Sequence, residues 1–181
     1  MASTIAAPPR ITILPHDPAP HSANRTGLIL GLAAVSMMFI GLTSAYVVSQ
    51  GLNPLWKQVH MRPLIWLDTA ILLFSSYTME RARRNISSRW LIATLLLGIT
   101  FLAGQIGVFA QLAQEGLYLN TGRQASFYYV LTGLHGLHIA GGIFALTWAT
   151  LRLRPSTLDL TAIYWHFMDA LWLYLLVVIF V

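Results

Sequence analysis

The chain of 181 residues is strongly apolar: 56% of its residues are hydrophobic and only 9% are charged. A soluble chain of this length cannot bury so much apolar surface in one core, so a lipid bilayer must cover the rest. The sequence contains no cysteine, which excludes disulfides, thiolate-ligated haem, iron–sulfur clusters and cysteine-bridged copper centres. Its net charge of +5 comes mainly from arginines near helix ends, which indicates topology control rather than nucleic-acid binding.

Hydropathy predicts an all-α membrane protein with five transmembrane helices. The expected spans cover residues 27–49, 63–79, 90–113, 127–150 and 160–181. Residues 1–24 contain several prolines and no apolar run resembling a signal peptide, so they are expected to form a flexible cytoplasmic tail. Residues 25–181 are expected to form one five-helix transmembrane domain.

The distribution of lysine and arginine predicts the orientation. With five spans, the N-terminal tail, the second loop and the fourth loop share one side and hold eight of the 11 basic residues. Since arginine-rich loops stay in the cytoplasm, the N-terminus is predicted inside and the C-terminus outside. The candidate contacts for lipid headgroups on the inner side are Arg25, Arg81, Arg84 and Arg89.

Two histidines, His135 and His138, lie three residues apart in the fourth predicted span. Because positions i and i+3 share a helix face, both rings are expected to point the same way. Neighbouring glycines such as Gly136 and Gly142 allow close approach of another helix. The leading interpretation is that neutral histidines hydrogen-bond across this contact; metal or haem ligation and a site tied to protons or lipid stay open.

The fifth predicted span carries His166 and Asp169, again spaced i, i+3. A histidine and a carboxylate on one face can form a charge-assisted pair that offsets part of the cost of burying each. Both a structural pair at a helix or subunit contact and a role in proton transfer are open interpretations.

Three more polar residues lie in or directly next to the second and third spans. Gln105 is expected in the polar interior, and Asp68 lies about one turn inside the outer end of its span, where snorkelling lowers the cost. Glu80 is expected to pair with Arg81 or Arg84 at the inner end.

A haem held between the fourth and fifth spans is disfavoured. His138 lies about 12 residues, or roughly 18 Å, from the inner end of its helix, whereas His166 lies about 6 residues, or roughly 9 Å, from the inner end of the next. The difference in depth of roughly 9 Å is too large for two ligands of one iron.

Two long motifs resemble the cytochrome c oxidase subunit III family. Residues 127–138 (Phe-Tyr-Tyr-Val-Leu-Thr-Gly-Leu-His-Gly-Leu-His) are similar to its Phe-Tyr followed by Thr-Gly-x-His-Gly-x-His, and residues 164–172 to its Tyr-Trp-His-Phe-Val-Asp signature. Shorter segments at 75–78 and 98–105 also resemble family segments. The resemblance covers residues 25–181 and implies the short five-helix form found among bacterial cytochrome c and quinol oxidases.

The resemblance implies an accessory subunit of a haem-copper oxidase, a proton-translocating oxidoreductase complex of aerobic electron transport in the bacterial inner membrane. Family members bind no haem or copper and have no catalytic residues of their own. They pack against subunit I, enclose phospholipid and support proton uptake. The implied partners are subunit I, subunit II, a small subunit IV and phospholipids, with haem and copper in the partner subunits. The electron donor and membership of a respiratory supercomplex stay open.

The sequence departs from the family at positions where many members carry glutamate. In the first span that glutamate falls at Ala34, and a second one falls at Val108, so no role of either is carried over. The alternatives are a related small subunit of a quinol oxidase or nitric oxide reductase, a b-type haem carrier, and a small transporter. A transporter would need helices interrupted at the membrane midplane.

Overall fold

The computed structural model describes residues 20–52, 63–116 and 122–180. All regular secondary structure in these ranges is α-helical, as the sequence predicts. The helices are α1 (Pro20–Gly51), α2 (Pro63–Asn85), α3 (Ser88–Gln114), α4 (Arg123–Arg152) and α5 (Pro155–Phe180). Each predicted span falls on one of these helices.

Helix α1 begins earlier than predicted. It starts at Pro20, so residues 20–24 of the predicted flexible tail are helical, while the rest of that tail lies outside the described residues. A proline fits the first turn of a helix because its missing N–H would have no intrahelical acceptor there. Proline content alone is therefore a poor marker for the end of this tail.

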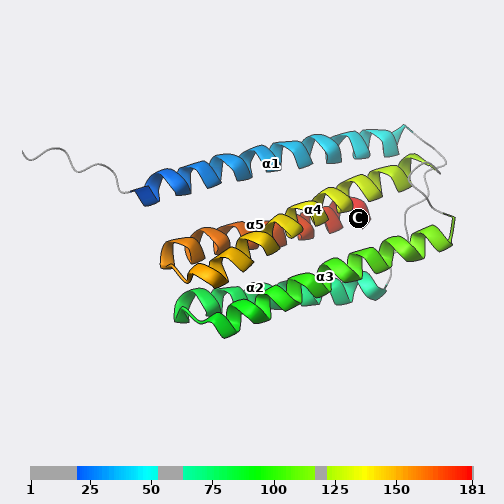
Figure 1. The fold of residues 1–181 in the computed structure, drawn as a ribbon. Coiled ribbons are helices and arrows are strands. Elements are labelled where there is room, and N and C mark those ends of the chain that lie inside the picture. Colours follow the sequence, from blue (N-terminus) through cyan, green and yellow to red (C-terminus); the bar gives the residue numbers. More distant parts are fainter. Residues whose placement is uncertain (1–19, 53–62, 117–121, 181) are drawn as a thin grey trace, which may run out of the picture.

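The helices form three layers (Figure 1). Helices α2 and α3 pack as one antiparallel pair, α4 and α5 pack as a second pair against it, and α1 lies on the outer side of that second pair. Within the described residues α1 contacts only α4 and α5. Helix α5 contacts α1, α2 and α4, and helix α4 contacts α1, α3 and α5, so the middle pair joins the layers on both sides.

Two short turns lie at the same end of the bundle (Figure 1). One joins α2 to α3 through Ile86, and the other joins α4 to α5 through Leu153; both residues have positive φ, 45° and 40°. Helix α1 also begins at this end. It is called the arginine-rich end below, because it collects Arg25, Arg81, Arg83, Arg84, Arg89, Arg152 and Arg154.

Four helices are long and apolar enough to cross a membrane: α1, α3, α4 and α5. Helix α2 is not among them, although it lies alongside α3. Its hydropathy is lowered by Asp68, by Ser75, Ser76 and Thr78, and by the charges at its arginine-rich end. The four apolar helices together with their many exposed large hydrophobic side chains are those of a membrane protein.

Candidate functional site

A seam of hydrogen bonds joins α2 to α5. The indole N–H of Trp172 donates to Thr69 Oγ1 at 3.1 Å, and that of Trp165 donates to Ser75 Oγ at 3.0 Å. All four side chains are buried, so the bonds satisfy polar atoms that water does not reach. The two bonds fix the register of α5 against α2 and so position the residues between the tryptophans.

His166 and Asp169 lie between these tryptophans. A hydrogen bond joins His166 Nδ1 to Ser76 Oγ on α2, and His166 Nε2 lies 3.8 Å from Glu80 Oε2. Asp169 lies one turn further along α5, near the Ser76 hydroxyl. Among the described residues, no well-aligned hydrogen bond reaches either of its carboxylate oxygens. The expected direct pair between His166 and Asp169 is not formed, because the histidine ring turns toward α2.

Glu80 lies at the arginine-rich end, beyond the predicted second span. Its carboxylate accepts from Arg83 Nε at 3.0 Å and from Arg84 Nε at 2.7 Å. The hydrogen bonds from these two guanidinium groups lower the pKa of Glu80 from 4.5 to about 2, so the carboxylate is ionised at neutral pH. The predicted pairing with Arg84 is formed, whereas Arg81 lies over the Tyr77 ring at 5.3 Å.

His135 is fully buried where α3, α4 and α5 meet. Its ring stacks on Trp172 with the centroids 5.2 Å apart and meets Phe101 edge-on at 6.1 Å. Neither ring nitrogen has a hydrogen-bond partner among the described residues. Aromatic contacts, rather than the expected hydrogen bonds across the helix contact, hold this ring.

His138 has different neighbours. Its Nδ1 bonds the carbonyl oxygen of Leu134 in the same helix at 2.8 Å, and its ring meets Phe39 of α1 edge-on at 5.8 Å. Tyr164 of α5 donates its hydroxyl to the His138 carbonyl oxygen at 2.8 Å. The expected common direction of His135 and His138 is not found, because three residues leave about 60° between side chains on a helix of 3.6 residues per turn.

Asp68 and Gln105 form a buried pair between α2 and α3. Gln105 Nε2 donates to Asp68 Oδ2 at 2.9 Å. Gln105 is in the interior as predicted, but the expected snorkelling of Asp68 is wrong, since Asp68 is only 2% exposed. The Asp68 carboxylate occupies the space where a side chain at Gly104 would lie, and this close approach brings the acid within reach of the amide.

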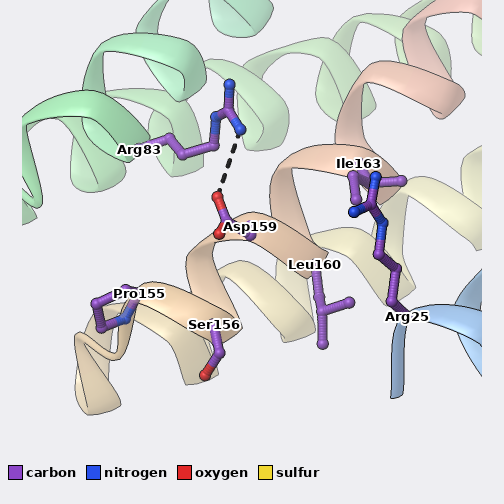
Figure 2. A pocket seen from close by; sticks show the side chains of 7 residues that line it. All are labelled: Arg25, Arg83, Pro155, Ser156, Asp159, Leu160 and Ile163. Atoms are coloured by element: carbon purple, nitrogen blue, oxygen red, sulfur yellow. Dashed lines mark hydrogen bonds and ion pairs between the residues drawn. The ribbon is translucent and has the colours of Figure 1, made fainter. Parts of the chain in front are cut away.

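A cavity of about 660 Å³ opens at the arginine-rich end, near the first turns of α1 and α5 and the end of α2 (Figure 2). Its lining comprises Arg25, Arg83, Pro155, Ser156, Asp159, Leu160 and Ile163. Arg83 Nη1 binds Asp159 Oδ1 at 3.4 Å, whereas Arg25 has no hydrogen bond or ion pair with a described residue. Arg25 is therefore the cavity guanidinium that no described carboxylate neutralises.

The other candidate headgroup contacts, Arg81, Arg84 and Arg89, are exposed at the same end of the bundle. They lie on α2 and at the start of α3, away from the α1 boundary of the cavity. Within the described ranges, no three histidine or acidic side chains converge as the ligands of a metal would. The contacts described above support hydrogen bonding and proton binding, and the guanidinium of Arg25 can contact an anion.

Comparison with known proteins gives one consistent family. The model of the family "Cytochrome c oxidase subunit III" matches residues 14–181. A cytochrome c oxidase subunit 3 from Synechocystis sp. is 32% identical, with 85% of this chain and 73% of the relative covered. A probable cytochrome c oxidase subunit 3 from Nocardia farcinica is 30% identical, with 88% and 91% covered.

A third relative, a probable quinol oxidase subunit 3 from Staphylococcus aureus, is 32% identical over 65% of this chain and 66% of its own length. The family match includes the histidine motif of α4 and the Tyr-Trp-His-Phe motif of α5, on which the resemblance rests. With a match that extends to all five helices, the chain belongs to the cytochrome c oxidase subunit III family of the haem-copper oxidases.

Proposed function

We propose that this chain is an accessory, metal-free subunit of a haem-copper terminal oxidase in a bacterial inner membrane. The family match over residues 14–181 carries this proposal. Subunits I and II would hold the haem and copper and reduce oxygen, and a small subunit IV is a further candidate partner. This chain would support subunit I, bind phospholipid and assist proton uptake, without catalytic residues of its own.

The proposed topology has five spans, with the N-terminus inside and the C-terminus outside. It counts α2 as a span because α2 is paired along its length with the apolar helix α3. The gathering of seven arginines at one end of the bundle supports a cytoplasmic location for that end. The domain would begin at Pro20, where α1 starts, rather than at residue 25.

Phospholipid is proposed to bind at the cavity of Figure 2 through Arg25. A guanidinium group presents paired donors to phosphate oxygens, and Leu160 and Ile163 give the cavity an apolar side for acyl chains. Replacing Arg25 with Gln should lower the phospholipid retained by the purified complex. The matched control is Arg123→Gln in the first turn of α4, at the opposite end of the bundle, which should retain lipid as the unmodified complex does.

The experiment that tests the subunit proposal is purification of a tagged chain in mild detergent, with mass spectrometry and a reduced-minus-oxidised spectrum. Recovery with a histidine-rich subunit I and an a- or o-type haem signal is expected. Recovery of the chain alone and colourless, under conditions that keep other respiratory complexes intact, would contradict it. A Soret band that follows the isolated chain would instead favour a haem carrier.

A second candidate, the corresponding subunit of a quinol oxidase, is supported by the Staphylococcus aureus relative, which is as similar in identity as the Synechocystis one. The two candidates differ in the electron donor and not in the proposed role of this chain. Oxygen consumption by the purified complex with reduced cytochrome c or with a quinol, each supplied alone, separates them.

A further inference from the structure

Asp169 is a buried carboxyl group whose surroundings do not explain how it is stabilised. It is 5% exposed, the Ser76 hydroxyl lies near it, and among the described residues no well-aligned hydrogen bond reaches either oxygen. An ionised carboxylate buried without a donor or counter-ion carries a large desolvation penalty. Protonation makes the carboxyl group neutral and removes this penalty. The group can then ionise only if a path carries its proton to water.

A set of side chains leads from the arginine-rich end toward Asp169, and its last step, from Ser76 to Asp169, is a near approach rather than a formed hydrogen bond. Ser76 lies beside Asp169, and its Oγ is hydrogen-bonded to His166 Nδ1. His166 Nε2 lies 3.8 Å from Glu80 Oε2, and the side chains of His166 and Glu80 are 40% and 25% exposed. The set therefore begins at groups open to the surroundings and ends at a buried acid.

The groups that face this set from the neighbouring helices are few. Helix α2 contributes Glu80 and Arg83, and Arg83 is held by Glu80 and by Asp159 of α5. From α4, the His135 ring stacks on Trp172 and the His138 ring meets α1. From α1, the charged side chain at this end is Arg25, which lines the cavity together with Arg83 and Ile163; further along the helix, α1 meets α5 through a Thr43–Tyr174 hydrogen bond.

Tyr164, a further titratable side chain of α5, donates its hydroxyl to the carbonyl oxygen of His138. It is thus engaged on the α4 side of α5 and takes no part in the set that faces α2. No described residue offers Asp169 a permanent counter-ion. Ser76 is the hydroxyl through which a proton could reach it.

We propose that Glu80, His166 and Ser76 form a proton-exchange arm that reversibly protonates Asp169 from the aqueous phase at the arginine-rich end. In the loading direction a proton from water binds His166 Nε2, which Glu80 attracts. His166 releases its Nδ1 proton to Ser76 Oγ, and the Ser76 hydroxyl gives its own proton to the Asp169 carboxylate. One proton enters, one stays on Asp169, and the imidazole is neutral at the end; unloading runs in reverse.

This inference deepens the proposed function, since it rests on the chain lying in a membrane within an oxidase. It assigns to this chain a buried, proton-binding carboxyl group, Asp169, at the inner end of the proton-exchange arm. That carboxyl group would buffer protons beside subunit I. Its chemistry depends on the α2–α5 contact and not on the identity of the electron donor.

The test is time-resolved infrared spectroscopy of the purified complex after a pH jump. The carbonyl stretching band of a protonated carboxylic acid that is lost in Asp169→Asn reports on Asp169 alone. The band should change with pH, and Ser76→Ala and His166→Phe should each slow its change by about 100-fold. Ser76→Thr, which restores a hydroxyl, should recover the rate.

The matched control is His138→Phe, a partly buried histidine of α4 outside the arm. It should leave the rate unchanged, and an unaltered haem spectrum should verify assembly of every variant. A band that Asp169→Asn does not remove, or a rate that is the same in Ser76→Ala, His166→Phe and the unmodified chain, would overturn the inference.

The subunit proposal and this inference fail separately. If the chain purifies without partners, the infrared measurement can be made on the chain alone. A pH jump applied to one side of sealed vesicles tests the topology separately. If the topology is inverted, so that the C-terminus lies inside, the Asp169 band will respond to the outer pH rather than the inner pH, and the dependence on Ser76 and His166 will be unchanged. The inference itself fails if Asp169→Asn leaves the band in place or if the rate does not depend on Ser76 and His166.

Discussion

The indole ring of Trp165 on α5 lies over Gly98 of α3 so closely that a Cβ added at Gly98 would stand 2.7 Å from Trp165 Cη2. The same ring lies against Gly142 of α4, where an added Cβ would be 3.1 Å from Cζ3. Trp165 is fully buried, and its N–H is bonded to Ser75. One side chain of α5 thus contacts three other helices, which small residues permit.

Gly98→Ala is expected to destabilise the chain by about 1–3 kcal/mol, because a rigid buried ring cannot move away from the added methyl group. The measurement is the thermal unfolding of the purified complex followed by circular dichroism. Gly107→Ala on the same helix is the matched control, since its added Cβ meets only Leu64 Cδ2 at an ordinary 3.7 Å. Equal unfolding temperatures for the two variants would contradict the proposed packing.

Gly104→Ala is expected to separate α2 from α3, because the added methyl group would overlap the Asp68 carboxylate. The loss should be about 1–3 kcal/mol, as the displaced Asp68 would also lose its hydrogen bond to Gln105. In an Asp68→Ala background the same substitution should cost clearly less, which a double-mutant cycle of unfolding free energies measures. Additive effects would show that Gly104 and Asp68 do not interact.

Ile86→Gly is expected to stabilise the turn between α2 and α3 by about 1 kcal/mol. Ile86 is a β-branched residue with φ at 45°, a conformation in which a Cβ is penalised and glycine is not. Ile86→Ala is the control, since it shortens the side chain but keeps the Cβ. The thermal midpoint should rise for glycine and stay within error for alanine; equal shifts would indicate an effect of side-chain size alone.

Removal of the Glu80 carboxylate should have an effect that depends on pH. The pKa of Glu80 is lowered from 4.5 to about 2 by hydrogen bonds from Arg83 and Arg84, so its stabilisation is present above pH 4.5 and is lost as pH falls toward 2. Because the ion pairs of Glu80 with Arg83 and Arg84 are partly exposed, Glu80→Gln should lower the free energy of unfolding by less than about 1 kcal/mol at neutral pH. Unfolding curves of both forms should converge on acidification, and a constant difference would rule out ionisation as the cause.

The helices could be predicted from the sequence because apolar runs in a bilayer have few alternatives to the α-helix. The family could also be predicted, since the motifs around His135 and His166 have a definite order and spacing. The side-chain partners could not. Ser76 as the partner of His166 depends on how α5 rotates against α2, which hydropathy does not report.

The position of Asp68 shows the same limit. Its place near a helix end predicts a side chain that reaches toward the membrane–water interface. Instead, the absence of a side chain at Gly104 leaves room on α3 for the Asp68 carboxylate, which is hydrogen-bonded to Gln105. A glycine directly before a glutamine in the neighbouring helix was the one available signal. It gains meaning only once the two helices are aligned.

The placement of α1 has a consequence for how the protein is made. Its contacts with α5 include Thr43 with Tyr174 and Tyr46 with Ile179, which are 131 and 133 residues apart in the sequence. Helix α1 therefore leaves the ribosome long before the surface on which it packs exists, whereas the α2–α3 and α4–α5 hairpins can form as they emerge. During synthesis α1 precedes both helices on which it packs, α4 and α5, and its hydrogen bonds to Tyr174 and Ile179 can form only once α5 has been made.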